Sequence, residues 1–192
     1  MSLRPWHMII VAALAAGAGF AAFQFIGEGS ASEAVTTPNT PAVDLRGDGL
    51  VGQRRPDYTL GSVDGSIVSA DEFDGQVVLV NFWATWCAPC REEMPMLMAF
   101  REDHRAKGVE VVGIAIDDVA AARGFVDELG IEYPNLVGST DVMATIRLYG
   151  NASGALPYTV LVDSDGIVRW TRMGVLEEED LESRIQAILD EI

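Results

Sequence analysis

The only two cysteines of the chain, Cys87 and Cys90, are separated by two residues, between an apolar run at residues 77–83 and a helical pattern. Two thiols at positions i and i+3 in the first turn of a helix can form a disulfide with little backbone movement. The positive end of the helix dipole also favours the thiolate, which is the nucleophilic form of cysteine. The spacing therefore predicts a redox-active dithiol.

Two other uses of this cysteine pair explain less. A purely structural disulfide that closes so short a loop contributes only about 2 kcal/mol in the chain-entropy estimate, against about 4.7 kcal/mol for a 100-residue loop. A closed zinc site usually takes four ligands, and the chain adds only His7 and His104. A CxxC motif near a βαβ pattern is typical of thioredoxin-like redox sites. We therefore expect neither a bound metal nor a cofactor.

The N-terminal part of the chain predicts a membrane anchor. Residues 8–26 carry no charged side chain and only one polar one, Gln24. A helix of this length extends about 28 Å, close to the ~30 Å hydrocarbon core of a bilayer. Arg4 precedes the run and acidic residues follow it, so residues 1–7 are expected in the cytoplasm and the rest outside it. We therefore predict a single-pass protein of the inner, cytoplasmic membrane.

A cleaved signal peptide is the alternative interpretation of the same segment. Its apolar region usually spans only about 7 to 15 residues before a cleavage site of small residues. Two segments offer such a site, residues 16–18 and residues 30–32. Both interpretations export the rest of the chain to the periplasm or extracytoplasmic space, where disulfides are formed.

After the apolar run the composition divides the chain into a linker and one domain. Residues 27–53 are rich in Gly, Ser, Ala, Thr and Pro without an apolar period, which predicts a flexible linker. Residues 54–192 are long enough for one domain with a substantial core. The net charge of −16 argues against nucleic-acid binding and is typical of a solvated acidic surface.

Within the domain, hydrophobic patterns predict a mixed sheet with helices on both sides. A hairpin around the turn at Asp64 and Gly65 comes first, and Ser69 with Glu72 can form a capping box. Strands are expected at 77–83, 109–116, 134–137, 158–162 and 167–170, and helices at 90–107, 119–129, 141–148 and 177–192.

Two segments carry a resemblance to a known family. The first closely resembles the active-site segment of the TlpA/ResA group of membrane-anchored thioredoxin-like proteins. It reads Asn81-Phe82-Trp83-Ala84-Thr85-Trp86-Cys87-Ala88-Pro89-Cys90-Arg91-Glu92-Glu93-Met94-Pro95. Residues 154–163, which contain Leu156 and Pro157, are similar to the group's cis-proline loop and following strand. The resemblance covers roughly residues 54–190 and implies a thioredoxin fold with an N-terminal hairpin and a central insertion at about 119–137.

The resemblance also implies roles for individual residues. Cys87 would attack a substrate disulfide and Cys90 would resolve the mixed disulfide, while the cis peptide bond before Pro157 would leave the backbone of Leu156 free to pair with substrate. Asn81 replaces the buried Asp of ordinary thioredoxins. A Glu three residues after the second cysteine is thought to move protons in ResA-like proteins, and Glu93 has this position.

The two tryptophans of the motif have different expected places. Trp83 lies in the predicted buried strand and should belong to the core. Trp86 directly precedes Cys87, so we expect it to form part of the exposed, substrate-binding rim of the site.

The sequence thus predicts a protein-disulfide reductase that acts on exported proteins. The family resemblance implies a membrane thiol transporter as electron donor, and apocytochrome c or a copper-site protein of respiratory oxidase assembly as substrate. An oxidant or isomerase and a non-catalytic copper carrier stay open as alternatives, although His104 lies about 20 Å along the helix from Cys90. A peroxiredoxin is disfavoured because Thr85 is two rather than three residues before Cys87.

Overall fold

A computed structural model describes residues 49–191. The predicted anchor at 8–26 and most of the predicted linker lie outside the described residues, and no helix between residues 49 and 191 has the length and apolar character to cross a membrane. The folded part begins before Arg54, where we expected the linker to end. Leu50 is buried, and the backbone of Gly52 and Gln53 bonds with Val168.

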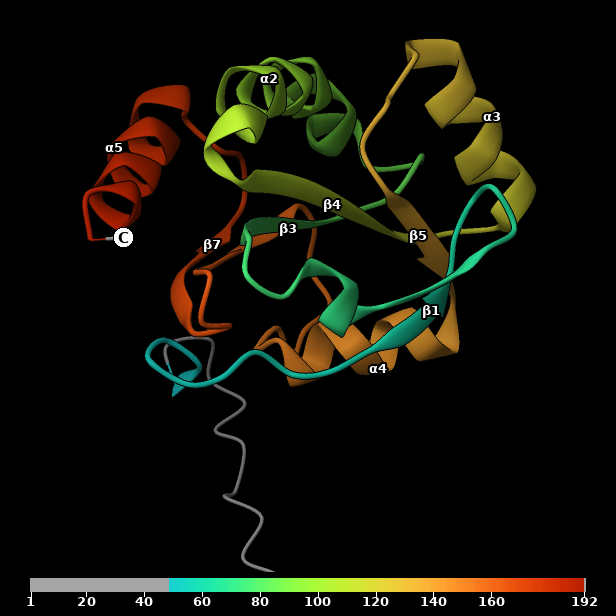
Figure 1. Cartoon of the computed structure of the whole chain (residues 1–192). Helices are drawn as coiled ribbons and strands as arrows, with labels where there is room; N and C mark the ends of the chain where they lie inside the picture. The colour runs from blue at the N-terminus through green and yellow to red at the C-terminus, as the bar shows by residue number, and fades with distance from the viewer. Residues whose placement is uncertain (1–48, 192) are drawn as a thin grey trace, which may run out of the picture. The chain divides into compact units, whose positions relative to one another are not determined.

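Five strands form one sheet in the order β5-β4-β3-β6-β7, and a separate hairpin, β1-β2, precedes them (Figure 1). β3 pairs in parallel with β4 and antiparallel with β6, so the sheet is mixed, as predicted. The elements follow in the order β1 (Thr59–Gly61), β2 (Ile67–Ser69), η2 (Ala70–Phe73), β3 (Val77–Trp83), α2 (Ala88–His104), η3 (Arg105–Lys107), β4 (Val109–Ile116), α3 (Val119–Leu129), β5 (Asn135–Gly138), α4 (Thr140–Leu148), β6 (Tyr158–Val162), β7 (Val168–Met173) and α5 (Glu178–Leu189).

The central strand β3 separates two hydrophobic clusters. All of its residues are buried, which explains why its sequence is apolar except for Asn81. Val77, Leu79 and Trp83 point to the cluster that contains the apolar sides of α2, α3 and α5. Val78, Val80 and Phe82 point to the cluster on the α4 side (Figure 1). Helices therefore cover both faces of the sheet, as the sequence predicts.

Helix α2 begins two residues earlier than the pattern predicts. Cys87 is its N-cap residue, and Pro89 lies in the first turn, where a proline's missing N–H is no loss. The helix continues through Pro95 to His104 and ends in the short 3-10 helix η3. Gly108 follows with φ +81°, a left-handed conformation that glycine adopts without strain.

The predicted capping box is present, and the expected central insertion, called the central segment below, contains regular secondary structure. Glu72 Oε1 accepts a hydrogen bond of 2.7 Å from the Ser69 backbone N–H at the start of η2. Residues 119–137 contain α3 and part of β5, and β5 pairs in parallel with β4 at the edge of the sheet. Asp118 caps α3 by accepting from the backbone N–H groups of Ala120 and Ala121.

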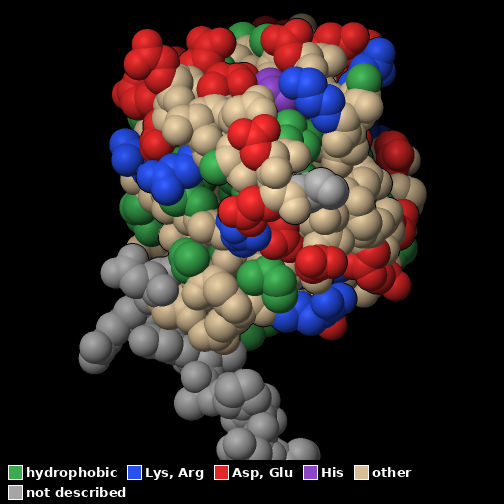
Figure 2. Space-filling view, turned by 60° about the vertical axis from the view of Figure 1, so that its left-hand side comes forward, with side chains coloured by type: hydrophobic (Ala, Val, Ile, Leu, Met, Phe, Trp, Pro, Cys, Tyr) green, Lys and Arg blue, Asp and Glu red, His purple; other side chains and the backbone are tan. Residues whose placement is uncertain are grey.

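The surface carries the acidity that the composition indicates. On the face drawn in Figure 2, Asp and Glu side chains gather along the upper rim, and Lys and Arg side chains are scattered singly or in small groups. Glu178, Glu179 and Asp180 occupy the first turn of α5, where the helix dipole favours negative charge.

One close contact beside the central strand depends on a glycine. A Cβ atom on Gly113 of β4 would lie 2.2 Å from Asn135 Oδ1 and 3.0 Å from Trp83 Nε1. The Asn135 amide fills this space, accepting from Trp83 Nε1 at 3.1 Å and donating to the Tyr133 carbonyl at 2.9 Å. Gly113 therefore allows β5 to be fastened to the strand that precedes the cysteine motif.

We predict that Gly113→Ala destabilises the oxidised domain by about 1–3 kcal/mol, because the new methyl group must displace the Asn135 amide from both hydrogen bonds. Gly124→Ala is the matched control, since nothing lies within 4 Å of its Cβ position in α3. Ala is a better helix former than Gly, so the control should gain up to about 1 kcal/mol. Urea unfolding measures both, and equal stability of the two variants would contradict this packing.

Candidate functional site

Cys87 and Cys90 form a disulfide at the N-terminal end of α2, with their Cα atoms 5.3 Å apart. β3 ends at Trp83, and the chain turns into the helix with the Cys87 N–H donating to the Ala84 carbonyl at 3.1 Å. Cys87 is the more accessible of the two, with 6% of its surface exposed, and Cys90 is fully buried. A substrate sulfur can therefore reach only Cys87. Because so little of Cys87 is exposed, the substrate must pack directly against this small accessible surface.

The helix end provides the electrostatic environment that a thiolate needs. The Cys90 backbone N–H donates to Cys87 Sγ at 3.3 Å, so the sulfur has the position of an N-cap acceptor. In the reduced protein this N–H and the helix dipole stabilise negative charge on Cys87 Sγ. No comparable donor to Cys90 Sγ is present among the described residues.

The predicted cis peptide bond is present between Leu156 and Pro157. The Pro157 carbonyl accepts from the Gly174 N–H at 2.9 Å, which joins this loop to the end of β7. Leu156 is half-buried and packs against the cluster that contains both cysteines. Between residues 49 and 191 no backbone hydrogen bond involves Leu156, so its N–H and carbonyl stay available to an extended ligand.

The two tryptophans lie where the sequence predicts. Trp83 is completely buried, while Trp86, directly before Cys87, is 68% exposed. An exposed ring of this size beside a reactive sulfur provides apolar contact area for a partner.

Glu93 lies on the buried face of α2, the helix that carries the disulfide. Its Oε1 atom accepts from Asn81 Nδ2 at 2.8 Å, and its Oε2 atom accepts from the Leu176 backbone N–H at 3.2 Å. Burial raises the pKa of the Glu93 carboxyl above its ordinary value, and these two hydrogen bonds lower it by less. A carboxyl with a raised pKa is suited to exchange protons near neutral pH.

Other residues that the sequence analysis missed surround Asn81 and Glu93. Asn81 Nδ2 also donates to Thr159 Oγ1 at 3.1 Å, from the position opposite it on β6. Asn81 Oδ1 and the Tyr133 hydroxyl are buried and have no hydrogen-bond partner among the described residues. Burial, and secondarily the negative charge of Glu93, raises the pKa of Tyr133. Pairing β3 with β6 in the predicted sheet could have identified Thr159, but nothing local indicates Tyr133.

Asp117 is another residue that the sequence analysis missed, and it holds the loop that carries Trp86 and Cys87. Its Oδ2 atom accepts from both the N–H and the hydroxyl of Thr85, at 2.7 and 2.6 Å. Asp117 directly follows β4, next to the end of β3. The carboxyl ends of adjacent parallel strands are where sites form in such sheets, and this signal could have identified it.

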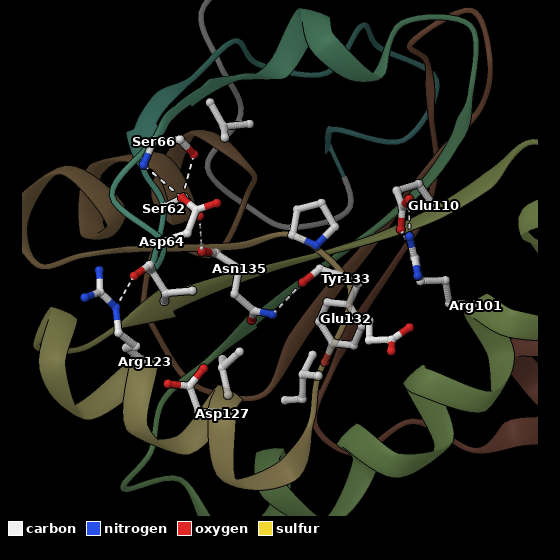
Figure 3. Close-up of a pocket in the computed structure, with 15 residues that line it drawn as sticks. Ser62, Asp64, Ser66, Arg101, Glu110, Arg123, Asp127, Glu132, Tyr133 and Asn135 are labelled. Carbon is white, nitrogen blue, oxygen red and sulfur yellow. Dashed lines mark hydrogen bonds and ion pairs between the residues drawn. The ribbon is translucent and has the colours of Figure 1, made fainter.

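A sizeable cavity lies away from the cysteine motif. It has a volume of about 550 Å³ and is bounded by the hairpin loop, α3 and the segment before β5 (Figure 3). Of the site residues described above, Tyr133 lines it, but neither cysteine does. Its polar groups mostly bond to one another, as Ser66 does to Asp64 and Arg123 does to the Val63 carbonyl. The cavity is a seam between the hairpin and the central segment.

His104 lies at the far end of α2, stacked on Phe100, with Nε2 3.3 Å from Glu182 Oε2. Between residues 49 and 191 no three His, Cys, Asp or Glu side chains are grouped so that they could hold a metal ion. The described part of the chain thus offers Cys87 and Cys90 no further ligand.

A helix-capping CxxC disulfide and a cis-proline, on a mixed sheet covered on both faces, define a thioredoxin-like thiol-disulfide oxidoreductase. The AhpC/TSA family matches residues 51–171. The thiol-disulfide oxidoreductases ResA of Bacillus anthracis and Geobacillus thermodenitrificans are 30% and 29% identical over 139 residues, which cover 72% of this chain and 78% of theirs. The chain belongs to the AhpC/TSA family and is a thiol-disulfide oxidoreductase of the ResA type.

Solved structures of similar proteins agree with this assignment. A thiol:disulfide interchange protein of the thioredoxin family from Chlorobium tepidum has a TM-score of 0.63 and 26% identity, covering 71% of this chain and 95% of its own. A secreted thiol-disulfide isomerase from Corynebacterium glutamicum has a TM-score of 0.65 and 28% identity, covering 72% and 86%.

We predict that the stability of the oxidised domain relative to a Glu93→Gln variant falls as the pH rises. The pKa of Glu93 is higher in the folded protein than in the unfolded chain. Protonated Glu93 therefore contributes stability that is fully present below the ordinary pKa of 4.5 and is lost as the pH rises through the raised pKa of the folded protein. Urea unfolding from about pH 4 to about pH 8 measures the difference. Glu92→Gln is the matched control, because it removes one carboxyl from the exposed neighbouring position of the same helix. Parallel pH curves for the two variants would exclude a raised pKa at Glu93.

Proposed function

We propose that this protein reduces disulfides of exported proteins outside the cytoplasmic membrane. The observation that carries the proposal is the Cys87–Cys90 disulfide at the α2 N-terminus, with one sulfur slightly accessible and the other enclosed. This asymmetry fits a nucleophile and a resolving thiol, the roles that the ResA resemblance implies. The unbonded backbone of Leu156, beside the cis-proline, supports binding of an extended substrate segment.

The proposed reaction begins with the reduced dithiol. The Cys87 thiolate attacks one sulfur of the substrate disulfide, forms a mixed disulfide and releases the other substrate sulfur as a thiol after it gains a proton. Cys90 then loses its proton and attacks Cys87 Sγ, which closes the enzyme disulfide and releases the second substrate thiol. The substrate gains two electrons and two protons, and the enzyme loses them.

Glu93 is proposed to take up the proton that Cys90 releases. Asn81 cannot do so because its amide does not titrate. Glu93, which accepts a hydrogen bond from Asn81, lies one turn of α2 after Cys90. A buried carboxyl with a raised pKa binds and releases a proton at smaller cost near neutral pH than an ordinary carboxylate does.

The cellular setting rests on the N-terminal sequence and on the relatives. We propose that residues 1–7 stay in the cytoplasm, that residues 8–26 anchor the protein in the inner membrane, and that a linker ending near residue 50 holds the domain outside. A membrane thiol transporter would return two electrons to the Cys87–Cys90 disulfide. The Corynebacterium relative is named as secreted, which supports an exported domain.

The proposed substrates are proteins with a cysteine pair, either apocytochrome c or a copper-site protein of respiratory oxidase assembly. The second candidate function is an oxidant or isomerase, which the name of the Corynebacterium relative favours. The two functions differ in the direction in which the dithiol exchanges electrons, and hence in its reduction potential.

We predict a reduction potential of about −270 mV or lower for the Cys87–Cys90 couple, the range of thioredoxin-like reductants. Equilibration of the protein with dithiothreitol or glutathione buffers, read by thiol alkylation and mass, gives the value. A potential near −120 mV would instead identify an oxidant.

We predict that Cys90→Ala traps the substrate on Cys87 as a stable mixed disulfide, because no thiol remains to resolve it. The full-length variant is expressed in its native membrane, and mixed disulfides are identified by mass spectrometry. Cys87→Ala is the control, since the enclosed Cys90 should trap nothing. Absence of any Cys87-linked protein, with normal cytochrome and oxidase maturation, would reject the reductase role.

A further inference from the structure

A small groove lies beside the first turns of α2, starting at the residue that follows Cys87. It has a volume of about 200 Å³ and is lined by Ala88, Arg91 and Glu92 of α2 and by Phe125 and Leu129 of α3. Ala88 is the residue next to Cys87 in the motif. The groove therefore begins one residue from the cysteine that a substrate disulfide must reach.

The groove exists because α2 only partly covers the apolar side of α3. Ala122 and Val126 on this side are buried in the core. Phe125 is half-buried, with its ring 5.6 Å from that of Trp83, and Leu129 is still 37% exposed. The two helices lie next to each other on one face of the sheet (Figure 1). An apolar strip is thus left open at their junction.

The charges on the groove do not favour a charged ligand. Arg91 and Glu92 are its only charged lining residues, and they have opposite signs. Its remaining lining is apolar, so a fitting occupant places an apolar side chain between the two helices and keeps its polar backbone at the rim.

We propose that this groove binds an apolar side chain of the substrate protein, located within a few residues of the cysteine under attack. The proposal rests on the proposed function, because a substrate polypeptide must reach Cys87. Since an extended chain advances about 3.3–3.6 Å per residue, a side chain two to four residues away reaches past Ala88 to α3. The central segment then contributes to substrate choice through Phe125 and Leu129.

The test compares Leu129→Ser with Leu148→Ser in the full-length protein. Both leucines are the last residues of their helices and are similarly exposed, at 37% and 43%, but Leu148 ends α4 on the opposite face of the sheet. Thermal unfolding checks that both variants fold. The substrates are disulfide-linked peptides in which a single Leu moves from about four residues before to about four residues after the target cysteine, with Ser at the other positions.

We expect the native protein to prefer one Leu position and Leu129→Ser to lower kcat/KM for that peptide about tenfold, the order for losing one apolar contact in a pocket. An all-Ser peptide and the small disulfide cystamine should react with both variants as with the native protein. If the two variants lowered kcat/KM equally, or if the native protein preferred no Leu position, the proposed binding in this groove would be wrong. An oligomer that only Leu129→Ser dissociates would also overturn it by showing a second copy as occupant. Failure of the native protein to reduce even cystamine would instead count against the proposed function.

Discussion

The structure depends on the complete burial of β3. Each of its residues is enclosed, both of its edges are paired, and its side chains alternate between two cores. A strand with these constraints cannot slip in register, because a shift of one residue would exchange the two faces. The chain leaves β3 at Trp83 and enters α2 at Ala88, after only four intervening residues, so the position of the disulfide is fixed by the most buried part of the domain.

The same burial explains why Asn81 and Glu93 belong together. Asn81 points from β3 into the core under α2, and a buried amide must find hydrogen-bond partners or destabilise the fold. Glu93, Thr159 and the Leu176 N–H provide most of the network, which joins β3, α2, β6 and the end of β7. Among residues 49–191 no donor reaches Asn81 Oδ1, and Glu93 has a raised pKa. The same hydrogen bonds therefore hold α2 against the sheet and keep a titratable group on its buried face.

Local patterns were enough to predict much of this domain. The apolar run of β3, the CxxC spacing and the capping box at Ser69 each have a signature of a few adjacent residues, whereas the cis bond before Pro157 was implied only by the family resemblance. The contacts that the sequence did not reveal join distant residues. Thr85 and Asp117 are 32 residues apart, and Asn81 and Thr159 are 78 apart. Such pairs follow from the register of the sheet, which hydrophobic periodicity alone does not give. Leu50 was assigned to the linker for a similar reason, since a single buried leucine has no period.

Recognition on the two sides of Cys87 differs in its physical basis. Leu156 offers only backbone groups, and a net protein hydrogen bond contributes about 0.5–1.5 kcal/mol whatever the substrate sequence is. The groove at Phe125 and Leu129 offers apolar surface, and full burial of one Leu or Phe side chain contributes about 1.5–3 kcal/mol. We therefore propose that the backbone contacts hold any extended cysteine segment, whereas the α3 side discriminates between segments. Since α3 lies in the central segment rather than in the βαβ unit with the cysteines, substrate choice can change there without altering the redox site.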